Sequence, residues 1–77
     1  MKSIDELVSE VTDAVERFSR STASLESWFY IWMRHMRFEE AVAHWRTAPS
    51  YQLKAEYAAL ARKRARTVLN RILAALE

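Results

Sequence analysis

The sequence predicts an all-α protein of three helices, and three observations carry that prediction. The 77 residues include no Gly and one Pro, so the chain has almost none of the residues that tight turns require. Apolar residues recur at the three- and four-residue spacing of amphipathic helices. A composition of 51% hydrophobic and 29% charged residues is typical of a globular protein rather than a disordered one. We expect one domain over residues 1–77, in which the second and third helices form an antiparallel hairpin and the first packs across them.

The first helix is predicted over residues 4–19. Ser3 and Glu6 have the spacing of a capping box, in which each residue satisfies the backbone amide of the other. The apolar stripe of this helix consists of Ile4, Leu7, Val8, Val11, Ala14, Val15 and Phe18. A serine-rich segment, 19–24, then interrupts the helical pattern, and either Thr22 or Ser24 is expected to cap the next helix.

The second helix is predicted over residues 25–46, because Pro49 cannot continue a helix. It has two apolar faces, and two neighbouring helices are too few to cover both. We assign the first face to the core; its residues are Leu25, Phe29, Trp32 and Met36. The second face is predicted to contact another protein chain, because Trp, Met and other large apolar residues are favoured at interface centres. Its residues are Trp28, Ile31, His35, Phe38 and Trp45.

The third helix is predicted over residues 51–76, with Ser50 as its N-cap. Three basic residues lie on one face, opposite the apolar stripe, where they would be able to contact phosphates or an acidic protein. These residues are Arg62, Lys63 and Arg66. Arg64 and Arg71 fall at the edge of the apolar stripe instead. A carboxylate of the first helix, or Glu39 or Glu40, is expected to pair with them, because an unpaired buried charge is costly. The alternative is that Arg64 and Arg71 face a partner at the edge of an interface, where Arg is enriched.

The charges are unevenly distributed along the chain. Residues 1–20 carry three basic and five acidic side chains, and residues 46–77 carry seven basic and two acidic ones. One interpretation is that the two segments attract each other within one molecule; the other is that the basic segment faces an acidic partner such as nucleic acid. Both interpretations are compatible with the sequence.

No catalytic or metal-binding pattern emerges from the sequence. His35 and Glu39 are four residues apart, as are Glu40 and His44, but the two pairs lie about 140° apart around a helix and cannot converge on one ion. We expect solvated pairs there. Cys is absent and no Ser/His/Asp grouping stands out. The expected protein is therefore not an enzyme and has no metal, cofactor or small-molecule substrate.

The sequence predicts neither a secretory signal nor a membrane span. Residues 1–6 are mostly polar, and the longest apolar run, residues 28–33, is far shorter than the roughly 20 residues that cross a bilayer. We expect a cytoplasmic protein without membrane contact.

The third helix resembles the last helix of the Hha family of nucleoid modulators in two short segments. These are Tyr57-Ala58-Ala59 and, thirteen residues after the tyrosine, Asn70-Arg71-Ile72. The acidic positions of the family's helix are occupied here by Arg and Lys. The resemblance implies no more than a small regulatory protein.

These observations predict a small, non-enzymatic helical protein that binds a larger protein as a stoichiometric regulator or inhibitor. Short helical regulators of this kind include those carried by phages and other mobile elements. The predicted contact surface is the aromatic face of the second helix, and a homodimer is expected because self-association is the commonest way to cover such a face. The alternative is a DNA- or RNA-binding regulator that uses the basic face of the third helix.

Overall fold

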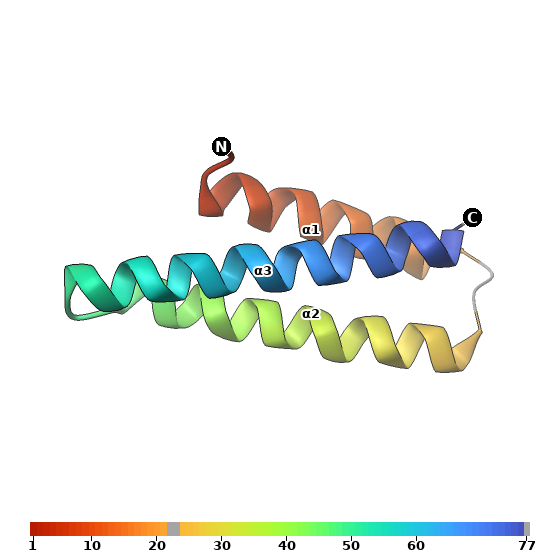
Figure 1. The fold of residues 1–77 in the computed structure, drawn as a ribbon. Coiled ribbons are helices and arrows are strands. Elements are labelled where there is room, and N and C mark those ends of the chain that lie inside the picture. Colours follow the sequence, from red (N-terminus) through yellow and green to blue (C-terminus); the bar gives the residue numbers. More distant parts are fainter. Residues whose placement is uncertain (22–23, 77) are drawn as a thin grey trace.

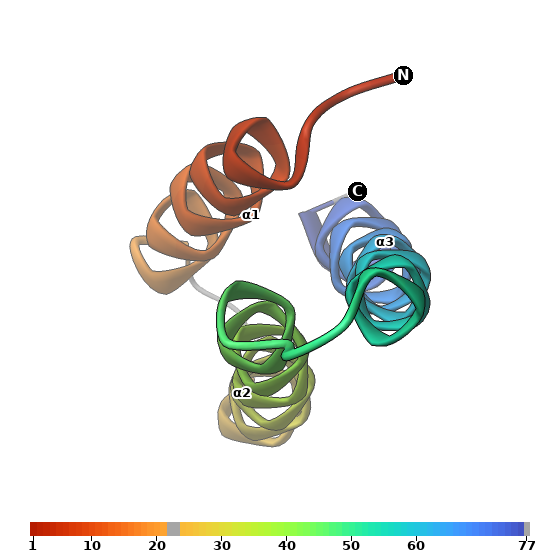
Figure 2. The same ribbon diagram turned by 90° about the vertical axis from the view of Figure 1, so that its left-hand side faces the viewer.

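The computed structural model describes residues 1–21 and 24–76 and contains α1 (Ile4–Ser19), α2 (Leu25–Arg46) and α3 (Tyr51–Leu76). These bounds confirm the predicted ones, and the described residues include no strand. α1 and α3 run in the same direction and α2 runs opposite to both (Figure 1). Seen along their axes, the helices occupy the corners of a triangle (Figure 2). α2 and α3 make the most extensive contact, as expected for a helical hairpin.

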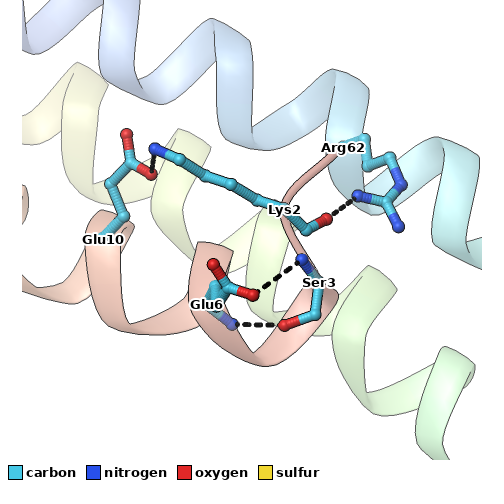
Figure 3. Close-up of polar contacts among 5 residues, drawn as sticks. All are labelled: Lys2, Ser3, Glu6, Glu10 and Arg62. Atoms are coloured by element: carbon cyan, nitrogen blue, oxygen red, sulfur yellow. Dashed lines mark hydrogen bonds and ion pairs between the residues drawn. The ribbon is translucent and has the colours of Figure 1, made fainter.

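Each helix begins at a serine cap. The Ser3 hydroxyl accepts a hydrogen bond from the Glu6 amide at 3.1 Å, and the Ser3 amide donates to the Glu6 carboxylate at 3.4 Å (Figure 3). This is the predicted capping box. Ser24 accepts from the amide three residues ahead at 3.2 Å, and Ser50 does the same at 3.2 Å. The alternative cap, Thr22, lies outside the described residues.

The three helices share one hydrophobic core. Its members come from all of them: Ile4, Val11, Val15, Phe18, Ile31, Phe38, Ala41, Val42, Ala61, Ala65, Val68 and Ile72. The largest fully buried side chains are Phe18, Phe38, Val11 and Val68. Small residues in the middle of α3, Ala61 and Ala65, are buried to 1% exposure or less. A core of this kind supports close packing of α3 against both neighbours.

The molecule is elongated because its helices lie side by side and the longest, α3, has 26 residues (Figure 1). The radius of gyration is 13.0 Å, whereas a compact chain of this size has one of about 11.5 Å. The start of α1 lies beside the end of α2 and the middle of α3: Asp5 forms an ion pair with Arg46 at 3.2 Å, and the Lys2 carbonyl accepts a hydrogen bond from Arg62 (Figure 3). The turn between α2 and α3 therefore projects beyond α1 (Figure 1). Within the described residues, no helix has a membrane-length stretch that is sufficiently apolar to cross a bilayer.

The assignment of the two faces of α2 was wrong, and the structure reverses it. Ile31, His35 and Phe38, predicted as contact residues, are buried with exposures of 3%, 8% and 1%. The four residues predicted as core are exposed, from 41% for Trp32 to 82% for Leu25; the other two are Phe29 and Met36. Of the remaining predicted contact residues, Trp28 is exposed and Trp45 is half-buried beneath the Lys54 ammonium group.

The reversal has a physical reason: the two faces of α2 stay apolar over different lengths of the helix. Beyond Met36, the next positions of the first face are occupied by Glu39 and Glu40, so that face is apolar only in the first half of α2. The second face continues as far as the small residues Ala41 and Val42, both buried. A helix that packs along the length of α3 must bury the face that stays apolar, since burying two carboxylates would be costly.

Phe38 and Phe29 provide a matched test of this reversal, because both are phenylalanines of α2. Phe38→Ala should lower the free energy of unfolding by about 3–5 kcal/mol, since it leaves a cavity in the core. Phe29→Ala should change that free energy by no more than about 0.5 kcal/mol, as expected for a surface residue. Urea denaturation followed by circular dichroism measures both. Loss of the fold in Phe29→Ala, with Phe38→Ala unaffected, would contradict the buried face described here.

Candidate protein-binding surface

The first half of α2 presents a continuous apolar surface to solvent, which we call the exposed stripe. It consists of Leu25, Trp28, Phe29, Trp32, Met33 and Met36. Their exposures range from 39% to 82%. With about 200 Å² for each large side chain, the stripe exposes roughly 650 Å² of apolar surface. This is at or above the upper end for the largest patch of an ordinary monomer, about 300–600 Å².

Two tryptophans give the stripe a rigid edge. The rings of Trp28 and Trp32 stack one helical turn apart, with centroids separated by 5.7 Å and planes inclined by 7°. Trp32 also contacts the buried His35 ring at 5.7 Å. Because these rings support each other, little side-chain entropy remains to be lost when a partner covers them.

Four arginines border the stripe on the side where α2 meets α3; we call them the arginine seam. They are Arg34 and Arg37 of α2 and Arg64 and Arg71 of α3. The Arg34 and Arg71 guanidiniums lie 4.9 Å and 4.5 Å from the centre of the Tyr30 ring. The Arg64 guanidinium donates a hydrogen bond to the Arg37 carbonyl at 2.8 Å. The seam is thus held together by contacts between the two helices.

The seam makes its surroundings electropositive. Within the described residues, the one carboxylate within 4.0 Å of a seam guanidinium is Glu40, which lies 4.0 Å from Arg64. Among the described residues, the expected pairing with Glu39 or Glu40 is thus found for Arg64, at 4.0 Å, and not for Arg71. Side-chain hydrogen bonding with Arg71, and then with Arg34, lowers the pKa of the Tyr30 phenol, because nearby cations favour the phenolate.

The His35–Glu39 pair differs from the expected solvated pair, whereas Glu40 and His44 are both exposed. His35 is buried, its Nδ1 makes no hydrogen bond to the described residues, and Glu39 Oε1 lies 3.6 Å away. The His44 ring packs against the Tyr57 ring at 5.0 Å. Among the described residues, no three His, Cys, Asp or Glu side chains are grouped so as to hold a metal ion.

The basic face predicted on α3 is only partly available. Arg62 is half-buried and donates to the Lys2 carbonyl (Figure 3), whereas Lys63 and Arg66 are exposed. No carboxylate of α1 lies within 4.0 Å of a cation of α3 in the described chain. The predicted attraction between residues 1–20 and residues 46–77 is therefore found, among the described residues, in the Asp5–Arg46 ion pair at 3.2 Å and not in ion pairs between α1 and α3.

The sequence identifies the apolar surplus of α2 but assigns it to the wrong face, and of the charged border it places only Arg64 and Arg71 at the edge of an apolar stripe. Leu25, Phe29, Trp32 and Met36 had been placed in the core, and Met33 had no predicted role. The adjacent carboxylates Glu39 and Glu40 were the available signal, because they end that face halfway along the helix. The meeting of Arg64 and Arg71 with Arg34 and Arg37 gave no comparable signal, since residues of the two pairs are 27–37 positions apart in the sequence.

Comparison with known proteins gives no relative for this arrangement. A scan against protein-family models, a search of curated proteins and a search of solved structures each find no match to this chain. The resemblance of α3 to the Hha family accordingly finds no support in these comparisons.

The ionisation of Tyr30 tests the contacts within the seam. Arg71→Gln should raise the pKa of the Tyr30 phenol, because removal of the cation makes loss of the phenolic proton less favourable. Lys63→Gln, an equal change in charge on an exposed part of α3, should leave that pKa unchanged. A pH titration of carbon-13-labelled tyrosine by NMR measures it, and Tyr30→Phe assigns the signal. An unchanged Tyr30 pKa in Arg71→Gln would mean that the two side chains do not interact.

Proposed function

We propose that this protein is a non-enzymatic, cytoplasmic interaction module that acts as a stoichiometric regulator or inhibitor of a larger protein. The surface that binds the partner is the exposed stripe of α2. One observation carries the proposal: six large apolar side chains on one face of a single helix, together of roughly 650 Å², are exposed.

The composition and size of the stripe favour a protein partner. Trp, Phe and Met are enriched in the buried centres of protein interfaces, and a stacked tryptophan pair is of the kind that dominates binding energy. A standard interface buries about 800 Å² on each partner. The stripe supplies most of that area, and its charged border supplies the polar rim.

Self-association is a second way to cover the stripe, and the homodimer predicted from the sequence stays a prediction. A dimer through this surface should have twice the monomer mass at micromolar concentration, and Trp32→Ala should convert it to monomer. Sedimentation equilibrium between about 1 and 100 µM measures this. A monomer mass across that range would mean that a second copy does not cover the stripe, which would then be available to a different protein.

Binding of nucleic acid through α3 also stays a prediction. Lys63 and Arg66 are exposed, but the Arg62 guanidinium donates a hydrogen bond to the Lys2 carbonyl. Such binding would weaken by about 0.9 log units per log unit of salt for each phosphate neutralised. Binding through the exposed stripe depends chiefly on apolar contacts and should respond much less to salt.

Truncation of the tryptophan pair tests the proposed function. Trp32→Ala should retain the fold and reduce partner binding by about 30-fold or more, as for a residue that contributes at least about 2 kcal/mol. The matched control is Tyr51→Ala, which removes an aromatic side chain with 96% exposure at the start of α3. The wild type and each variant are used to capture proteins from the native host, and the captured proteins are quantified by mass spectrometry. The affinity of each captured protein for the wild type and the variants is then measured with purified components. Equal binding by the wild type and Trp32→Ala would refute the stripe as the binding surface.

A further inference from the structure

The exposed stripe and the arginine seam form one composite surface. A hollow of about 480 Å³ lies where they meet, and both contribute to its lining: Glu26, Phe29, Tyr30, Met33, Arg34 and Arg37. A second hollow of about 310 Å³ continues across to α3 and is lined by Tyr30 and Arg71 among others. A partner that covers the stripe therefore has the seam along one side.

We propose, building on the proposed function, that the segment that occupies this surface is an amphipathic helix of another protein. Its apolar face lies on the exposed stripe, and Asp or Glu residues along one of its edges face the arginine seam. The inference names the chemistry of the partner and not its identity.

The spacing of the stripe indicates a helical occupant. Leu25, Phe29, Trp32 and Met36 are separated by four, three and four residues, which is the alternation of a seam between two packed helices. They extend over about 16 Å of helix, or three turns. An occupying helix would pack at an axial distance of about 8–10 Å, and its long edge residues would then reach the seam.

The charges of the seam indicate an acidic edge. Arg34, Arg37 and Arg71 have no carboxylate within 4.0 Å in the described part of the chain, and Arg64 has one at 4.0 Å. A partner that removes water from such a border pays a desolvation cost unless it supplies opposite charges. Carboxylates suit this role because Arg binds them in a planar, two-bonded geometry.

A second copy of this chain that packs antiparallel about a twofold axis would complement the surface less well. In that pairing the arginine seam of each copy lies on the same side of the interface as the seam of its partner. Each border carries four arginines against two carboxylates, Glu26 and Glu40. Like charges that face each other across an interface are unfavourable. An acidic partner meets no such repulsion.

Two synthetic peptides test the inference. Each contains three heptads with Leu at the a and d positions; one has Glu at the flanking e and g positions, and the other has Lys there. Binding is measured by anisotropy of the labelled peptide and by tryptophan emission, to which the exposed Trp28 and Trp32 contribute. The Glu peptide should bind at least tenfold more tightly than the Lys peptide at low ionic strength, and high salt should reduce that difference.

Charge reversal in the seam provides the matched comparison. Arg37→Glu combined with Arg71→Glu should invert the preference, so that the Lys peptide binds more tightly. Lys63→Glu with Arg66→Glu makes the same change in net charge away from both hollows and should preserve the preference of the wild type. If the double reversal does not fold by circular dichroism, Arg37→Gln with Arg71→Gln replaces it and should abolish the preference.

Three results would overturn the acidic-helix inference. If both peptides bind equally and Trp32→Ala weakens both, the stripe binds protein but the seam does not select charge, so the proposed function survives alone. If neither peptide binds, the acidic-helix inference fails, and the proposed function is tested separately by the capture experiment with Trp32→Ala. If the wild-type protein forms a dimer below about 10 µM that Trp32→Ala dissociates, a second copy is the occupant.

Discussion

The arrangement depends on the geometry of three helices around one core. In a triangular bundle each helix contacts two neighbours, which cover about one side of its circumference. For α1 this suffices, because its apolar side faces the core; α3 also buries an apolar side but leaves Leu53, Leu73 and Leu76 exposed. α2 is apolar on two sides, so one had to remain in solvent. Phe38 and Val42 are buried within the bundle, and Phe29 and Met36 lie outside it.

The lengths and positions of the helices determine where the uncovered surface falls. α1 has 16 residues, against 26 for α3, and it packs more extensively on α3 than on α2. The buried residues of α2 begin at Ile31, so the first turns of that helix contribute none. An apolar surface left open in so small a protein costs solubility. Its retention is consistent with use as a binding surface.

The uncovered apolar surface has an electropositive border on one side. The arginine seam lies along one border of the exposed stripe, where α2 and α3 meet, and two of its members share the Tyr30 ring. Since the seam is stabilised by an aromatic ring and a backbone carbonyl more than by carboxylates, its charge remains largely unneutralised. In the proposed complex the apolar stripe supplies contact area, and the seam restricts which partners match it.

The sequence by itself determined the secondary structure, because helix boundaries depend on local chemistry. Ser3, Ser24, Ser50 and Pro49 act on backbone groups a few residues away, and all three helices have the predicted bounds. Periodicity likewise identified the buried stripe of α1. Only the tertiary structure decided which face of α2 is buried and which arginines gather at its border. Those outcomes depend on how far an apolar face continues beside a long neighbouring helix, and on contacts between residues distant in the chain. Residue spacing within one helix contains neither kind of information.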